Sequence, residues 1–156
     1  MLPENQLTAL QEFCDRSVFQ AGTKPLKNGT EIAIYVDGKG PLNLIKREGR
    51  AVLLVEAPKK ADLSLYMAPG ALAALSALST EDVGEVGVEI LKLMAESDPD
   101  RKVEVKVHIG IIDFVFHGYL GILPLGGATV MKFLASKGFN SISKIREAIA
   151  NLRSER

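Results

Sequence analysis

The sequence predicts an α+β fold, in which helices cover a sheet of about five mostly antiparallel strands. Apolar and polar residues alternate over four short segments between residues 31 and 67, and again over residues 103–109. Before, between and after these segments, apolar residues recur every three or four positions, as in amphipathic helices. A chain of 156 residues can bury one core, so we expect a single domain over residues 1–156.

An amphipathic helix is expected at the start of the chain, from Pro3 to about Gln20. Pro3 suits the first turn of a helix, where its missing N–H costs nothing. The apolar residues that would face the core are Leu7, Leu10, Cys14 and Val18. Gly22 is expected to end this helix.

Four short strands joined by tight turns are expected next, over about residues 32–36, 42–45, 51–55 and 61–67. Asp37-Gly38 and Glu48-Gly49 predict hairpin turns, because glycine adopts a positive φ without strain. The third strand is apolar on both faces, which indicates an interior or covered strand. In the fourth strand, Asp62, Ser64 and Tyr66 form the polar face. Turns this short favour antiparallel neighbours.

Two helices are expected after the fourth strand. Pro69 opens a short one that is rich in leucine, and Ser79 or Thr80 caps a longer one. Gly84 and Gly87 weaken the longer helix, which indicates either that another segment approaches its backbone closely or that it is mobile.

A long strand over residues 103–116 is expected to follow, with a bulge at Gly110 that shifts the alternation by one residue. With that shift, Ile112, Phe114 and Phe116 continue the buried face. One helix is then expected over about residues 128–137, and the last helix begins at Ser141 or Ser143.

Charge and cysteine content exclude several classes of protein. The 19 basic and 19 acidic residues balance, which does not suit a nucleic-acid-binding protein. Cys14 is the single cysteine, so an internal disulfide is excluded and we expect a core residue. The N-terminus has no secretory signal pattern and no apolar run is long enough for a membrane-spanning helix, so we expect a cytoplasmic protein.

A metal-ion or catalytic site could use His108, Asp113 and His117, because imidazole and carboxylate groups bind Zn²⁺ and exchange protons. On an extended strand, however, the two histidines would lie about 30 Å apart. The alternative is that His108 faces solvent and that Asp113 and His117 form hydrogen bonds at the end of the strand. We expect no metal and no cofactor.

Large apolar residues gather in the C-terminal half of the chain: Phe114, Phe116, Leu120, Ile122, Leu123, Met131, Phe133 and Leu134. The glycines among them leave space, and methionine fills space adaptably. Ligand cavities are mostly apolar with few polar groups. This group would therefore line a cavity or form an ordinary packed core.

Three runs of residues carry a resemblance that covers most of the chain in layout. They are Glu31–Val36, Leu42-Asn43-Leu44, and Ala61–Met67 leading into Gly70–Leu75. Together they resemble the sterol carrier protein type 2 family, in which a last strand and C-terminal helices close an apolar tunnel against the sheet. The resemblance implies such a tunnel here, lined by Met67, Leu72, Leu75, Phe114, Phe116, Leu120, Leu123, Met131 and Leu134.

The function that this resemblance implies is non-enzymatic binding or transfer of a lipid, such as a sterol, a fatty acyl chain or an isoprenoid. Burial of apolar ligand surface contributes about 25 cal/mol per Å², so a long chain needs no specific polar partner. Transient contact with a membrane is compatible with this hypothesis. Two alternatives remain: a scaffold or accessory protein of a lipid- or quinone-modifying pathway, and a small metal-dependent enzyme that uses His108, Asp113 and His117.

Overall fold

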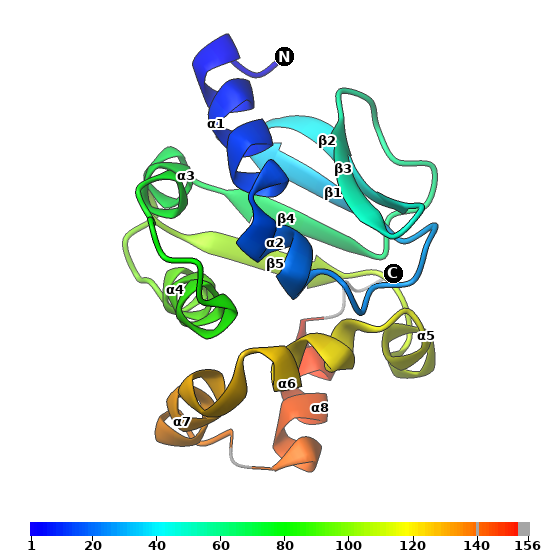
Figure 1. The fold of residues 1–156 in the computed structure, drawn as a ribbon, viewed down its shortest axis with the longest axis vertical. Coiled ribbons are helices and arrows are strands. Elements are labelled where there is room, and N and C mark those ends of the chain that lie inside the picture. The colour runs from blue at the N-terminus through cyan, green and yellow to red at the C-terminus, as the bar shows by residue number, and fades with distance from the viewer. Residues whose placement is uncertain (140, 153–156) are drawn as a thin grey trace.

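The structure, a computed structural model, describes residues 1–139 and 141–152. It contains one five-stranded sheet, with the N-terminal and central helices packed on one face and the C-terminal helices gathered beyond the β5 edge (Figure 1). The strands are β1 Glu31–Val36, β2 Lys39–Arg47, β3 Arg50–Leu54, β4 Leu63–Met67 and β5 Val103–Val107. The predicted α+β class is confirmed.

The strand order is β3-β2-β1-β4-β5, and three of its four pairings are antiparallel. The pairing of β1 with β4 is parallel, with Ile34 opposite Leu65. The sheet is mostly antiparallel, as predicted, but the expectation that short turns join antiparallel neighbours is wrong for the connection from β3 to β4. Residues 55–62 carry the chain from the β3 edge across to the far side of β1, so β4 enters the sheet beside β1 and not beside β3.

The carboxylate of Glu31 fastens this crossing segment to the sheet. Its two oxygens accept hydrogen bonds from the backbone N–H groups of Lys59 and Lys60, both at 3.2 Å. Oε2 also accepts one from Nδ2 of Asn43 at 2.7 Å. A side chain at the start of β1 therefore orders the loop that delivers β4.

The two predicted hairpin turns are confirmed. Asp37 and Gly38 have φ values of 52° and 73°, and Glu48 and Gly49 have φ values of 49° and 80°. Positive φ at both central residues matches the right-handed twist of the flanking strands.

The first predicted helix is broken into α1 Glu4–Asp15 and α2 Ser17–Gly22. The break lies at Arg16, whose backbone is extended at φ −62° and ψ 143°. The Arg16 guanidinium donates to the carbonyl oxygens of Leu78 and Thr80 at 2.6 and 2.7 Å. These bonds link the break to the segment that follows α3, a long-range interaction that local periodicity does not encode.

Helices α3 Pro69–Ser76 and α4 Val83–Met94 follow β4 as predicted. The cap of α4 is Asp82 and not Ser79 or Thr80, since Oδ1 of Asp82 accepts from the N–H of Gly84 at 2.7 Å. A Cβ atom at Gly84 would lie 2.5 Å from the carbonyl oxygen of Gly126. Of the two interpretations of the glycines in α4, the close approach of another segment is therefore the one observed.

The predicted long strand is wrong beyond Val107. Gly110 precedes helix α5 Ile111–Phe116, where the N–H of Phe114 bonds to the carbonyl of Gly110 at 2.9 Å. The six residues of α5 are apolar except Asp113, and such a run fits a helix as well as a strand. The remaining elements are the 3₁₀ turn η1 Tyr119–Gly121, α6 Ile122–Leu125, α7 Gly127–Ser136 and α8 Ile142–Asn151.

The interior divides into two apolar clusters. The main core lies between the sheet and helices α1 to α5, and a smaller cluster is formed by Val130, Leu134 and Ile145 of α7 and α8. Half-buried Leu120 and Ile149 pack against both clusters. We call the boundary between the two clusters, where Leu120 and Ile149 lie, the seam.

Within residues 1–139 and 141–152, no single helix has the length and apolar character needed to cross a bilayer. Among the described residues, one bent helix pair, Tyr119–Leu125 with Gly127–Ser136, reaches that length and apolar character when its two halves are counted together.

Candidate functional site

The residues predicted to line a ligand cavity are divided between the two clusters and the surface. Buried in the main core are Met67, Leu72, Leu75 and Phe114. Leu134 is buried in the smaller cluster, against which Leu123 packs, and Leu120 packs against both clusters. The structure therefore places Leu120, Leu123 and Leu134 at or beside the seam, with Leu72 and Leu75 on α3 in the main core.

Two of the predicted residues do not lie in the interior. The side chain of Phe116 is 73% exposed and that of Met131 is 45% exposed. The cause at Phe116 is the helical conformation of α5: it buries Phe114 and turns Phe116 outward, whereas a bulged strand would place both on one face. The described residues do not show the apolar tunnel that the resemblance implied.

An exposed apolar face runs along α5. Ile112, Val115 and Phe116 are 67%, 42% and 73% exposed. Their spacing of three and four residues places them on one side of the helix. We call these three residues the α5 ridge.

A buried polar cluster holds the C-terminal end of α5 against the sheet. Oδ2 of Asp62 lies 2.5 Å from Nδ1 of His117 and accepts a hydrogen bond from the hydroxyl of Tyr119 at 3.2 Å. Asp62 precedes β4 and is itself bound to the sheet, since its N–H donates to the carbonyl of Glu31 and its carbonyl accepts from the N–H of His108. The cluster joins the start of β4 to the segment between α5 and η1.

Burial and the neighbouring charge of Asp62 raise the pKa of the Tyr119 phenol well above its usual range. The hydroxyl therefore stays protonated and acts as a donor to the carboxylate. The ring of Tyr119 stacks on that of Phe114 with centroids 4.6 Å apart, so the same residue links the polar cluster to the main core.

Sequence reasoning missed the role of Asp62 and Tyr119. The period-two pattern of the fourth strand placed Asp62 and Ser64 on its polar face, yet they are only 4% and 5% exposed. His117 and Tyr119 cover Asp62, and Nε2 of His108 lies 2.7 Å from Oγ of Ser64. Because these partners are more than 40 residues away in the sequence, no local signal could have identified the cluster.

The structure does not bring His108, Asp113 and His117 together as a metal or catalytic triad. His108 contacts Ser64, His117 contacts Asp62, and Asp113 is exposed on α5. Among the described residues, no group of three or more His, Cys, Asp or Glu side chains could hold a metal ion. The predicted hydrogen bond of His117 is present, but its partner is Asp62.

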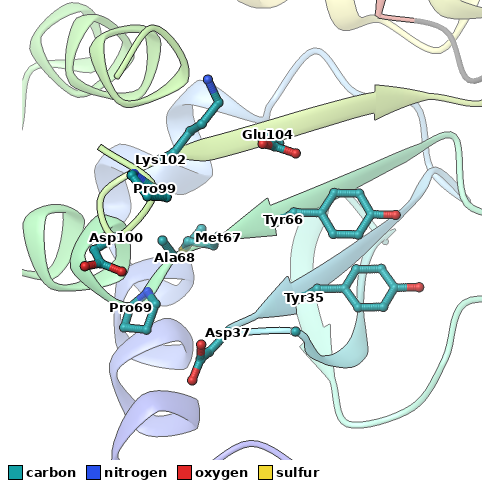
Figure 2. A pocket seen from close by; sticks show the side chains of 11 residues that line it. Tyr35, Asp37, Tyr66, Met67, Ala68, Pro69, Pro99, Asp100, Lys102 and Glu104 are labelled. Carbon is teal, nitrogen blue, oxygen red and sulfur yellow. The ribbon is translucent and has the colours of Figure 1, made fainter. Parts of the chain in front are cut away.

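A separate hollow of about 260 Å³ lies at the ends of β1, β4 and β5 (Figure 2). Tyr35 and Tyr66 stack at its rim with ring centroids 4.8 Å apart, and Lys106 Nζ lies 5.6 Å from the Tyr66 centroid. Its lining also includes four charged side chains, Asp37, Asp100, Lys102 and Glu104. Of the predicted ligand residues it includes only Met67, and this charged lining does not suit an apolar chain.

A protein of similar structure is found among the solved structures. The sequence matches no family model and no curated protein. The solved structure is described as "UbiJ-SCP2 Ubiquinone synthesis protein"; it has 18% sequence identity and a TM-score of 0.41, over 81% of this chain and 96% of that chain.

Proposed function

We propose that this protein binds a lipid or another long apolar molecule at the seam, without catalysing a reaction on it. The observation that carries the proposal is the division of the interior into two apolar clusters that meet at Leu120 and Ile149. A ligand that enters between the two clusters meets apolar side chains on either side, which suits a long apolar molecule.

The residues around the seam supply the surface that such a ligand needs. Leu120, Leu123 and Ile149 are half-buried, so their remaining apolar area gains from contact with a ligand. Each methylene group of a buried acyl or isoprenoid chain contributes about 0.8 kcal/mol. We expect affinity to rise with chain length and to depend little on the polar end, because aliphatic side chains dominate the seam.

The direct test is mass spectrometry of the purified protein under native and then denaturing conditions, with organic extraction of what is released. A lipid present in near-stoichiometric amount supports the proposal and identifies the ligand class. A protein that is empty and also fails to bind fluorescent fatty acids of any chain length contradicts it.

Substitutions at Leu120 test the position of the site. Leu120→Asp places a carboxylate between the clusters, and Leu120→Trp fills the seam while keeping it apolar. Both are expected to reduce the affinity for a fluorescent fatty acid by at least about tenfold, a loss of roughly 1.4 kcal/mol. The matched control is Val55→Asp, at a residue that is 48% exposed beyond the end of β3. Unchanged binding by the folded Leu120→Trp variant would show that the ligand lies elsewhere.

The second candidate function is that of a scaffold or accessory protein in a lipid- or quinone-modifying pathway. The α5 ridge favours it, because exposed apolar surface on a small protein often marks an interaction site. A protein that carries no ligand and does not bind fatty acids, but forms a complex that Phe116→Asp disrupts, would favour this candidate over the first.

A further inference from the structure

The charge of this neutral chain is unevenly distributed. The C-terminal helical region, residues 111–152, and the loop of residues 23–30 contain six basic residues, Lys24, Lys27, Lys132, Lys137, Lys144 and Arg146. They contain only two acidic residues, Asp113 and Glu147, which leaves a net charge of +4. Because the whole chain has 19 residues of each sign, the rest of it carries −4. All six basic residues are exposed.

Two of these basic residues lie in a loop that packs against the end of α5. The N–H of Lys27 donates to the carbonyl of His117 at 2.9 Å. Gly118 packs so closely on the same loop that a Cβ there would lie 2.0 Å from the carbonyl oxygen of Pro25. The loop that carries Lys24 and Lys27 therefore lies next to the C-terminal end of α5, the helix that Figure 1 shows at one end of the C-terminal helical region.

The α5 ridge and its surroundings combine the two features of a surface that lies on a membrane. Ile112, Val115 and Phe116 present apolar side chains on one face of a helix. Lysines beside such a face are attracted to anionic headgroups, and the attraction weakens as salt is added. Asp113, also exposed on α5, opposes this attraction but is outnumbered by Lys24 and Lys27.

We propose that the α5 ridge, together with Lys24 and Lys27, docks this protein on the surface of an anionic lipid bilayer. The ridge enters the interface between headgroups and acyl chains, and the lysines contact the headgroups. This inference goes beyond the proposed function, because docking requires no ligand at the seam. It would also bring the seam, next to η1 and α7, close to a bilayer from which an apolar ligand could be taken.

The test is co-sedimentation of delipidated protein with vesicles of phosphatidylcholine alone or mixed with phosphatidylglycerol. Binding to the anionic vesicles is expected to exceed binding to the neutral vesicles by at least about tenfold, and to fall when the salt is raised from 0.05 to about 0.5 M. Phe116→Asp and Ile112→Asp are each expected to reduce binding by at least about tenfold. The double variant Lys24→Glu/Lys27→Glu is expected to abolish the preference for anionic vesicles.

Matched controls place the same changes away from the ridge. Val55→Asp adds a carboxylate at an exposed apolar residue, and Lys59→Glu/Lys60→Glu reverses two exposed lysines. These controls are expected to bind vesicles as the parent protein does. Circular dichroism checks that each variant is folded, which is expected because every altered side chain is exposed.

Three results would overturn the inference: no binding to anionic vesicles, binding that the ridge variants leave unchanged, or equal losses in ridge and control variants. Concentration-dependent self-association that Phe116→Asp abolishes, without vesicle binding, would assign the ridge to a second copy of the chain instead. Fatty-acid binding in the absence of vesicles is measured separately, so failure of docking and failure of the proposed function are distinguishable.

Discussion

The polar cluster around Asp62 gives the sharpest prediction about stability. Asp62→Ala removes a carboxylate that is bound to Nδ1 of His117 at 2.5 Å and to the hydroxyl of Tyr119 at 3.2 Å. A hydrogen bond to a charged group contributes about 1.5–3 kcal/mol, and a buried donor left without a partner costs about 1–3 kcal/mol. Tyr119 is only 7% exposed, so water cannot easily replace the lost acceptor. We expect Asp62→Ala to lower the free energy of unfolding by about 3 kcal/mol.

Urea denaturation followed by circular dichroism measures this loss, with Asp113→Ala as the control. Asp113 is exposed on α5, and its removal is expected to change stability by less than about 0.5 kcal/mol. A double-mutant cycle that combines Asp62→Ala with Tyr119→Phe isolates the contribution of their hydrogen bond, which we expect to be about 1 kcal/mol or more. A loss below about 1 kcal/mol for Asp62→Ala would refute the argument, since the carboxylate would then not be holding α5 to the sheet.

Three further predictions concern other parts of the structure. Gln20→Ala should lower the free energy of unfolding by about 1–2 kcal/mol in urea titrations, because the Gln20 amide pairs with both the N–H and the carbonyl of Ala51 on the edge strand β3. An unchanged urea midpoint would show that water replaces the Gln20 side chain in these hydrogen bonds. Gly84→Ala should lower the melting temperature, because its Cβ would meet the Gly126 carbonyl oxygen at 2.5 Å. This clash is expected to outweigh the helix propensity of alanine, which is better than that of glycine by about 1 kcal/mol. A higher melting temperature would mean that α7 moves away freely. Burial raises the pKa of the Cys14 thiol to about 12, so the folded protein keeps a proton that the unfolded chain loses above its ordinary pKa of 9.0. This group alone should therefore lower stability by about 2 kcal/mol between pH 8 and 10.5. The fall over this range should be smaller by that amount in Cys14→Ala, and an equal slope in both proteins would contradict the prediction.

The α5 segment shows why a short apolar run could not be assigned from its sequence. Ile112, Phe114 and Phe116 alternate as a strand requires, while Ile112, Val115 and Phe116 have helical spacing. Only the environment distinguishes the two, since a strand beyond Val107 would have had to continue its pairing with β4. The N–H of His108 still bonds to the carbonyl of Asp62, in the register of that pairing, and the chain then leaves the sheet and turns into α5 at Ile111. The exposed position of Phe116 could therefore not be predicted from this pattern.

The sequence indicated several of the apolar residues near the candidate site, but not how the structure arranges them. The leucines at positions 120, 123 and 134 were identified from their apolar neighbourhood, and the structure places them at or beside the seam. The seam itself arises because α7 and α8 form their own small cluster, whose contacts span residues that are far apart in the chain. Asp62 was assigned only to the polar face of its strand, because alternation describes which side of a strand a residue takes, but not what covers that side.

The sequence by itself determined the features that depend on a few neighbouring residues. The positive-φ turns at Asp37-Gly38 and Glu48-Gly49, the helix opened by Pro69 and the start of α8 after Ser141 are of this kind, because backbone strain and capping act within one turn. Only the tertiary structure decided that β4 lies parallel to β1, that Arg16 interrupts the first helix and that Asp62 is buried beneath His117 and Tyr119. The physical reason is that strand pairing and burial depend on which distant groups satisfy each other's hydrogen bonds.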